Sequence, residues 1–230
     1  MTRSNEHDRR IAAMFDRIAP RYDFLNRVLS FGRDASWRRR AVALAGLGAG
    51  ERALDVGAGT GDLALALAKA GPSGRVVALD LSPKMLSRAR LRADASIGFV
   101  VGSAEALPFP DGLFSCVVAG FAVRNFGDLP RALEDMRRVL RPGGRAVVLE
   151  LSLPPSPTLR ALHRFYLHRV APAIATVLGS SSEAYRYLPA SIEAFPEPER
   201  LAAALRDAGF QRVGYERLTF GVATIHVGQI

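Results

Sequence analysis

Residues 54–62, Leu54-Asp55-Val56-Gly57-Ala58-Gly59-Thr60-Gly61-Asp62, carry the clearest structural signal in this chain of 230 residues. An apolar run at residues 52–56 leads into the glycines, and residues 62–70 follow with a helical composition. A glycine-rich turn between a strand and a helix lets the backbone approach a ligand closely. The stretch therefore predicts the first strand–turn–helix unit of an α/β sheet, with a ligand at the turn.

The same alternation of strand and helix continues on the C-terminal side. Further strands are expected at residues 75–79, 97–101, 114–120 and 145–151. Between them, Ser82-Pro83 starts a helix that runs to about residue 93, and a second helix at residues 129–140 stops at Arg141-Pro142-Gly143-Gly144. Strands separated by helix-length segments predict a parallel sheet that is covered on both faces.

The tail of the chain has a different order of elements. A helix at residues 199–208 precedes two apolar runs, residues 211–219 and 222–227, which a turn at Gly221 separates. Two strands joined by a tight turn form a hairpin, so one of them runs antiparallel to the rest. The fold class expected is therefore α/β: a Rossmann-like, seven-stranded, mostly parallel sheet with helices on both faces and a C-terminal antiparallel hairpin.

Two segments lie outside this alternation. Residues 1–45 form an N-terminal arm with a helical pattern, and residues 152–198 form a helical insertion within the main domain, residues 46–230. The chain has 31 Lys+Arg against 22 Asp+Glu, a net charge of +9, and the arm holds +5 of it as ten Arg against five acids. This basicity predicts either a phosphate-rich partner or a codon bias toward Arg.

Composition excludes several classes of protein. The apolar fraction is 49% and the charged fraction is 23%, which is typical of a globular domain and not of a disordered chain or a coiled coil. No apolar run approaches the roughly 18 residues of a membrane-spanning helix, and the N-terminus has no secretory signal. A single cysteine, Cys116, excludes an internal disulfide and a cysteine-based zinc site.

Three cofactor classes compete for the glycine-rich turn. A dinucleotide fingerprint has its third glycine one position later, where this chain has Asp62, and a carboxylate there repels a pyrophosphate. A Walker A loop is excluded because no Gly-Lys-Ser/Thr is present. S-adenosylmethionine (SAM), which is cationic and has no phosphate, suits the turn better; the other reading is a tight turn with no ligand.

Residues after the other strands support a SAM site. Asp80 follows the second strand, where a carboxylate can accept both ribose hydroxyls. Ser103 and Ala104 follow the third strand, where the adenine edge would be read, and Gly120 after the fourth leaves room for the methionine part or is merely a turn. All three places are carboxyl ends of strands, where open α/β sheets bind ligands.

Longer motifs give a resemblance to a known family. The glycine-rich turn, Asp80 and Arg141-Pro142-Gly143-Gly144 resemble class I SAM-dependent methyltransferases. More specific runs resemble the ubiquinone/menaquinone biosynthesis C-methyltransferases over nearly the whole chain. These runs are Phe15-Asp16-Arg17-Ile18-Ala19-Pro20-Arg21-Tyr22-Asp23, Leu29-Ser30-Phe31-Gly32, Trp37-Arg38, Ala104-Glu105-Ala106-Leu107-Pro108-Phe109, Phe121-Ala122-Val123-Arg124-Asn125, Tyr185-Arg186-Tyr187-Leu188, Ser191-Ile192, Phe195-Pro196 and residues 221–228.

The resemblance implies a cofactor and its contacts. The cofactor is SAM without a metal, and its contacts match Thr60, Asp80, Ser103, Ala104 and Gly120 beside the glycines Gly57, Gly59 and Gly61. The family usually has Asn or Asp at the position of Ser103 and Ser at that of Gly120, so these two hydrogen bonds are in question.

The implied reaction is C-methylation of a prenylated quinol ring, either a naphthoquinol such as demethylmenaquinol or a benzoquinol. Arg124 and Asn125 are the candidates for holding the quinol oxygens, because a cation near the hydroxyl favours the nucleophilic phenolate. Tyr22, Tyr185 and Tyr187 line the ring pocket or are aromatic core. His226 is as compatible with a neutral core histidine as with a base.

The substrate's apolar tail implies a partner and a location. We expect a cytoplasmic enzyme that docks peripherally at the inner face of the cell membrane through the arm and does not bind nucleic acid. The sequence leaves the oligomeric state open, and a homodimer is one of the alternatives. Two alternatives stay open: a methyltransferase for another small molecule, and a nucleic-acid-binding protein on a Rossmann-like scaffold, for which binding would depend steeply on salt.

Overall fold

A seven-stranded sheet forms the centre of the computed structural model, which describes residues 3–71, 73–177 and 182–230. The strand order is β3-β2-β1-β4-β5-β7-β6, and within this sheet β7 runs in the opposite direction to the other six strands. The strands are β1 (Arg52–Val56), β2 (Arg75–Asp80), β3 (Ile97–Val101), β4 (Phe114–Gly120), β5 (Leu140–Leu151), β6 (Gln211–Leu218) and β7 (Ala223–Gln229). The expected parallel sheet and C-terminal hairpin are thus confirmed.

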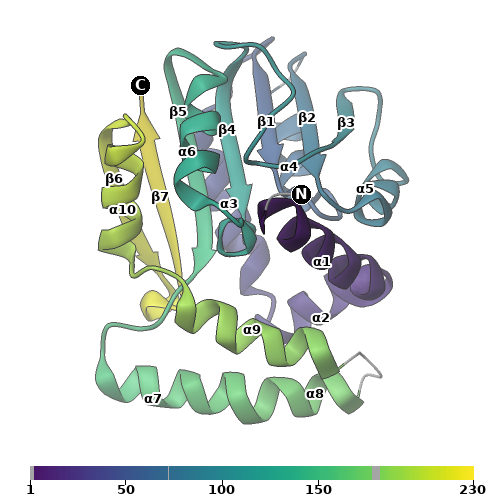
Figure 1. The fold of residues 1–230 in the computed structure, drawn as a ribbon, viewed down its shortest axis with the longest axis vertical. Coiled ribbons are helices and arrows are strands. Elements are labelled where there is room, and N and C mark those ends of the chain that lie inside the picture. The colour runs from purple at the N-terminus through teal and green to yellow at the C-terminus, as the bar shows by residue number, and fades with distance from the viewer. Residues whose placement is uncertain (1–2, 72, 178–181) are drawn as a thin grey trace.

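Helices cover both faces of the sheet (Figure 1). One core cluster joins the sheet to α3 (Arg33–Ala45), α4 (Asp62–Ala70) and α5 (Pro83–Arg90). The other joins it to α6 (Leu129–Arg138) and α10 (Pro198–Asp207). Both clusters form because the central strands β1 and β4 are buried almost throughout, as strands between two helical layers must be.

The expected stop after α6 is wrong in one detail. The sequence predicts that Arg141-Pro142-Gly143-Gly144 separates the helix from the next strand, whereas β5 already begins at Leu140. Leu140 pairs with Phe114, but the next pair is Arg145 with Cys116, so the register shifts across the four intervening residues. The turn is therefore a bulge inside the strand.

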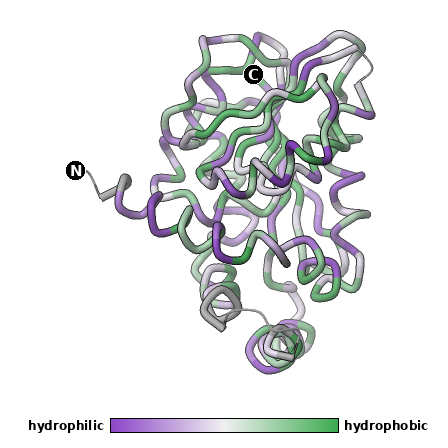
Figure 2. The backbone as a smooth tube through the Cα atoms, turned by 90° about the vertical axis from the view of Figure 1, so that its right-hand side faces the viewer, coloured by the Kyte–Doolittle hydropathy of each residue, from purple (hydrophilic) through white to green (hydrophobic). Residues whose placement is uncertain are grey.

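The first two helices of the arm and the helices of the insertion lie at the carboxyl ends of the parallel strands (Figure 1), whereas the third helix of the arm, α3, packs on a face of the sheet. The arm comprises α1 (Arg3–Ile18), the short turn η1 (Ala19–Arg21), α2 (Tyr22–Leu29) and α3. The insertion comprises α7 (Pro157–Phe165), a π-helical turn η3 (Tyr166–Val170), α8 (Ala171–Val177) and α9 (Ser182–Ala194). Figure 2 shows α7 and α8 at the lower end of the molecule, set apart from the apolar strands.

Candidate active site

The loop after β1 has the conformation that its glycines allow. Gly57 and Gly59 have φ values of +70° and +56°, in the left-handed region that favours glycine. A Cβ atom on Gly57 would lie 2.4 Å from the Cβ of Ala122, whereas one on Gly59 would meet no atom within 4 Å. Gly57 therefore allows the loop to pack against the segment after β4, and Gly59 leaves open space at a cavity.

Asp80, at the end of β2, is held by this loop. Its Oδ2 accepts a hydrogen bond of 2.8 Å from the Gly59 N–H, and its Oδ1 accepts one of 2.8 Å from the Ser82 N–H. Burial raises the pKa of this carboxyl group, although both backbone N–H groups oppose that rise. An ionised carboxylate has about four acceptor positions, so Asp80 keeps capacity for two ligand hydroxyls.

A first cavity, called here the cofactor cavity, opens beside Asp80. Of the residues that the sequence assigns to SAM binding, Gly57, Gly59, Asp80, Ser103, Ala104 and Gly120 line it. The apolar side chains of Leu81 and Met85 line it as well. The acceptor Asp80, the bare backbone at Gly59 and these apolar side chains meet at the carboxyl ends of the strands, an arrangement that fits the nucleoside part of SAM.

Helix α1 forms a wall of the cofactor cavity, and no pattern in the sequence predicts this contact. Asp8, Ile11, Ala12 and Phe15 of α1 line the cavity wall. Burial raises the pKa of Asp8, and a hydrogen bond with Ser103 offsets part of that rise. The arm therefore contributes to the cofactor side as well as to the substrate side.

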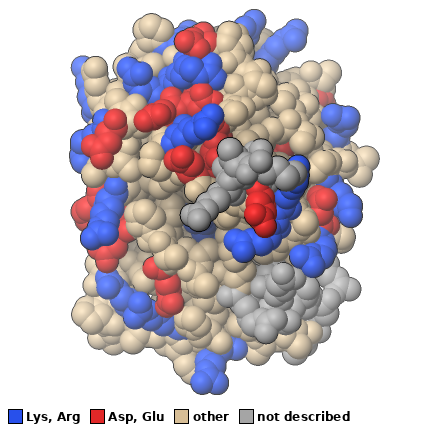
Figure 3. All heavy atoms as spheres, in the orientation of Figure 1, with Lys and Arg blue, Asp and Glu red and all other residues tan. Residues whose placement is uncertain are grey.

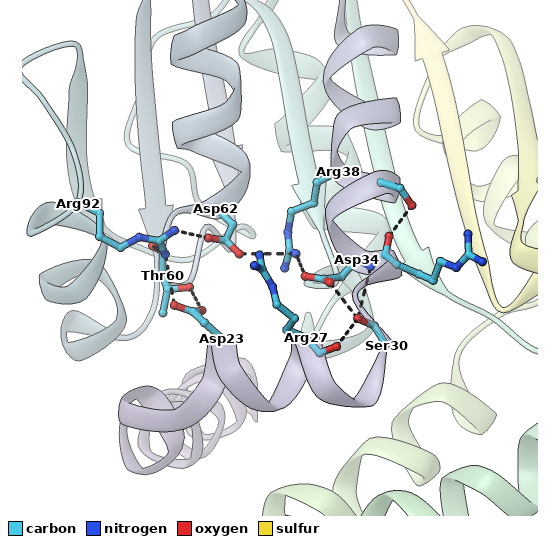
Figure 4. Close-up of polar contacts among 10 residues, drawn as sticks. Asp23, Arg27, Ser30, Asp34, Arg38, Thr60, Asp62 and Arg92 are labelled. Atoms are coloured by element: carbon cyan, nitrogen blue, oxygen red, sulfur yellow. Dashed lines mark hydrogen bonds and ion pairs between the residues drawn. The ribbon is translucent and has the colours of Figure 1, made fainter.

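Thr60, Gly61 and Asp62 do not line the cavity (Figure 4). The Thr60 hydroxyl donates to Asp23 of α2. Asp62 pairs with Arg92 at 2.6 Å and with Arg38 at 3.6 Å. The sequence-based argument that the Asp62 carboxylate faces the ligand is therefore wrong, because two arginines hold it at the arm. Direct cofactor contacts of Thr60 and Gly61 stay predictions.

A second cavity, called here the substrate cavity, adjoins the first and has a volume of about 420 Å³. Tyr22 and Phe121 belong to the walls of both cavities. The substrate cavity is lined mainly by apolar and aromatic groups, and its volume lies in the range that takes small ligands. Its principal side chains, besides these two, are Leu29, Phe31, Trp37, Arg124, Leu151, His163, Tyr166, Leu167 and Leu188.

Three arginines line the substrate cavity, Arg33, Arg38 and Arg124, and Arg124 is buried more deeply than Arg38. The Nη1 of Arg124 lies 2.5 Å from Oε1 of Glu150 and donates to the Phe121 carbonyl at 2.7 Å. Burial lowers the pKa of Arg124, but the Glu150 carboxylate outweighs it, so the pKa stays above its ordinary value. Its buried Nε has no hydrogen-bond partner among the residues described. The guanidinium is thus charged, fixed in position and able to donate once more.

Asn125 and the tyrosines occupy different walls. Asn125 lines the cofactor cavity, and its Oδ1 accepts a hydrogen bond of 2.9 Å from the Tyr187 hydroxyl. Tyr187 therefore supports Asn125. The side chain of Tyr185 lies outside the part of the chain whose side chains are described. Of the two predicted tyrosines whose side chains are described, Tyr22 lines the substrate cavity and Tyr187 does not.

The insertion adds residues that sequence reasoning did not identify individually. Tyr166 donates to the Leu29 carbonyl at 2.7 Å and so ties η3 to the arm. His163 of α7 lines the substrate cavity, and its buried Nδ1 has no partner among the described residues. Burial lowers the pKa of His163. The available signal was the His- and Tyr-bearing pattern of the insertion, which indicates a face but not these residues.

His226 lies in the core and not at either cavity. It is fully buried on β7, and its Nε2 lies 2.9 Å from the Pro198 carbonyl oxygen. Burial lowers its pKa to about 4, so the ring is neutral. Of the two roles that the sequence left open, this environment is that of a core histidine.

Comparisons with known proteins agree with this geometry. The model of the ubiE/COQ5 methyltransferase family matches residues 1–230. The chain is 52% identical to a demethylmenaquinone methyltransferase of Thermus thermophilus, over 94% of this chain and 99% of that protein. It is 43% identical to a ubiquinone/menaquinone biosynthesis C-methyltransferase UbiE of Geobacter sulfurreducens, over 100% and 91%.

The solved structures support the same fold. A SAM-dependent methyltransferase from Aquifex aeolicus superposes with a TM-score of 0.62 at 18% identity, over 84% of this chain and 89% of the other. At that identity the likeness concerns the fold alone, and the family match identifies the enzyme class. The chain belongs to the ubiE/COQ5 methyltransferase family and is a SAM-dependent methyltransferase.

Proposed function

We propose that this enzyme transfers a methyl group from SAM to a ring carbon of demethylmenaquinol, a prenylated naphthoquinol. The observation that carries the proposal is the pair of adjoining cavities: one is built around Asp80 and the glycine loop, and the other is apolar and holds the buried Arg124. Curated relatives that are named for demethylmenaquinone support the naphthoquinol over the benzoquinol.

The residues of the cofactor cavity fit SAM. Asp80 would accept the ribose hydroxyls, Ser103 would meet the adenine edge, and the bare backbone at Gly59 would allow close approach. When bound, SAM supplies an electrophilic methyl group on a sulfonium. Tyr22 and Phe121 line both cavities, so the two reactants would meet beside these side chains, and methyl transfer would occur there.

Arg124 stabilises the reacting form of the quinol. A hydroxyl that has lost its proton makes the neighbouring ring carbon nucleophilic, and the guanidinium next to the phenolate oxygen favours that charge. Because Glu150 and the Phe121 carbonyl already hold Nη1, and Nε is buried, Nη2 is the group that would donate to the phenolate. Asn125, held by Tyr187, would orient the ring from the cofactor side.

His163 would accept the hydroxyl proton or a hydrogen bond from it. The ring carbon then forms its bond to the methyl group as the bond from carbon to sulfur breaks. S-adenosylhomocysteine is released, the proton of the same ring carbon passes to water, and return of the hydroxyl proton from His163 to the oxygen restores the aromatic quinol. Direct displacement of this kind requires alignment of the two reactants and no metal.

The prenyl tail places the substrate in a lipid bilayer, so we infer that the enzyme works at the inner surface of the cell membrane. Among the described residues, no helix has the length and apolar character needed to cross a bilayer. Docking would therefore be peripheral, and the basic arm, residues 1–45, provides cations that an anionic surface attracts.

A side-by-side assay tests the substrate. Radiolabelled SAM is supplied with short-tailed demethylmenaquinol in one reaction and with the corresponding demethyl benzoquinol in the other. We expect kcat/KM for the naphthoquinol to be at least about tenfold higher, because the ring size determines how well the apolar cavity is filled. Equal values, or preference for the benzoquinol, would assign a different ring to the site.

A further inference from the structure

Helix α7 is amphipathic but buries no residue. Leu159, Leu162 and Phe165 recur every three residues, which places them along one side of the helix. Their side chains are 38%, 64% and 60% exposed. A helix of a globular protein normally covers its apolar side with the core, whereas this stripe has no such cover among the described residues.

Two exposed phenylalanines lie at the same end of the molecule. Phe31, in the turn between α2 and α3, is 76% exposed, and its ring lies 5.6 Å from that of Tyr166 in η3. Phe220, in the short turn η4 (Thr219–Gly221), is 81% exposed. η4 packs on the segment leading into α7, because the Ser152 hydroxyl donates to the Gly221 carbonyl at 2.7 Å.

Both phenylalanines also have left-handed backbone conformations. The φ value is +51° at Phe31 and +57° at Phe220, a region that bulky residues rarely adopt. An exposed aromatic ring in such a conformation contributes little to folding. Strained residues of this kind concentrate where a binding surface requires them.

This surface surrounds the open end of the substrate cavity. Phe31 lines the cavity and is also largely exposed, so the cavity reaches solvent at that ring. His163, which lies between two stripe residues in α7, Tyr166 at the start of η3, and Thr219, which precedes Phe220, line it too. We call Phe31, Leu159, Leu162, Phe165 and Phe220 the apolar rim.

The segment that carries most of the apolar rim is basic, although Arg164 and His168 lie 3.0 and 3.2 Å from Glu193 of α9. Between Glu150 and Glu183, residues 151–182 include no Asp or Glu and three arginines, Arg160, Arg164 and Arg169. In Figure 3 the surface over α7, at the lower edge, is tan and blue. Apolar side chains flanked by arginines match the boundary between the acyl chains and the anionic headgroups of a bilayer.

We propose that the apolar rim inserts into the surface of an anionic bilayer, so that the substrate cavity opens directly toward the lipid. The inference deepens the proposed function, because a quinol could then pass from the bilayer to Arg124 with its tail still in lipid. In this arrangement α7 and η4 make the main contact with the bilayer, and not the arm as a whole. Helix α1 of the arm covers the cofactor cavity, and the arm contributes Phe31 to the apolar rim.

Vesicle binding tests the proposal without any turnover. The wild-type protein and a double variant, Leu162→Ser with Phe165→Ser, are sedimented with vesicles of phosphatidylglycerol and phosphatidylcholine, or of phosphatidylcholine alone. We expect binding to the anionic vesicles, weaker binding to the neutral ones, and at least about tenfold weaker binding by the double variant. Leu91→Ser is the matched control, because Leu91 is 88% exposed but follows α5, away from the rim.

Turnover assays separate this proposal from the proposed function. The double variant should keep wild-type turnover of a short-tailed quinol in solution and lose turnover of a long-tailed quinol in vesicles. Wild-type protein that stays off anionic vesicles, or an equal loss of binding in Leu91→Ser, would overturn the docking surface. So would a dimer of wild-type protein that the double variant dissociates without any change in vesicle binding. Absence of naphthoquinol methylation by a vesicle-bound protein would instead contradict the proposed function.

Discussion

The cofactor cavity and the substrate cavity share Tyr22 and Phe121 but are built from different parts of the chain. The cofactor cavity lies mostly on strand ends, where backbone groups and one carboxylate, Asp80, define its shape. The substrate cavity is assembled mainly from side chains of the arm, η4 and the insertion, together with Phe121 and Arg124 from the segment after β4. Backbone groups at the strand ends thus form the site for SAM, whereas side chains from the added helices form most of the site for the quinol.

The largest effect should come from Arg124 in the substrate cavity. Arg124→Ala removes the donor next to the phenolate, and we expect turnover to fall by about 10²–10³-fold with little change in SAM affinity. The measurement is kcat together with the Kd of S-adenosylhomocysteine. Because the substitution leaves Glu150 buried and unpaired, the double variant Arg124→Met with Glu150→Gln serves as the control for folding. A variant that retains near-normal turnover would remove Arg124 from the reaction.

The next effect should be confined to the other cavity. Asp80→Asn removes the charged acceptor for the ribose and disturbs the loop that donates to it, so we expect SAM to bind about 100-fold more weakly. The KM of a short-tailed quinol should change little at saturating SAM. Calorimetric titration with SAM and steady-state kinetics give both values. If the two reactants weaken equally, the cavities are not separate sites.

A smaller effect should depend on pH. His163 accepts a proton or hydrogen bond only when neutral, and burial lowers its pKa, so the neutral form prevails above pH 6.5. Turnover should therefore hold at pH 6.5 and decline only in more acidic solution. His163→Gln should lower turnover about tenfold and flatten this acidic limb of the kcat profile. An unchanged limb in the variant would indicate that another group titrates.

The smallest effect concerns stability on the cofactor side. Burial raises the pKa of Asp55 to about 7, far above the roughly 3.9 of an exposed carboxyl group. Its contribution to stability is therefore complete below pH 3.9 and is lost as the pH rises through 7. Asp55→Asn should raise the melting temperature at pH 8 by a few degrees and at pH 5 by only about a third as much. Equal shifts at both pH values would argue against a buried, titrating carboxyl group.

The two cavities also differ in how far the sequence predicts them. The glycine loop, Asp80 and Ser103 each follow a strand, and parallel strands bring their carboxyl ends together, so spacing alone places them at one site. Arg124 follows the fourth strand and was predicted for the same reason. His163 and Tyr166 come from an insertion whose docking depends on tertiary contacts, such as the hydrogen bond from Tyr166 to Leu29.

Some residues were misplaced because their partners are distant in sequence. Asp62 follows the glycine loop directly, but Arg38 of the arm and Arg92 after α5 hold its carboxylate away from the cavity (Figure 4). Likewise, α1 closes the cofactor cavity through residues whose amphipathic pattern indicates a helix and not its partner. Local patterns identify elements, whereas such contacts are determined by the assembled fold.

Fluorescence of the single tryptophan tests most directly whether the ring binds in the substrate cavity. Trp37 lines that cavity but not the cofactor cavity, and its Nε1 donates to Thr219 at 2.9 Å. Titration with a short-tailed naphthoquinone, a contact quencher, should quench its emission saturably, and saturating S-adenosylhomocysteine should neither quench nor prevent quenching. Quenching that never saturates, or that S-adenosylhomocysteine abolishes by competition, would contradict the account of two adjoining sites.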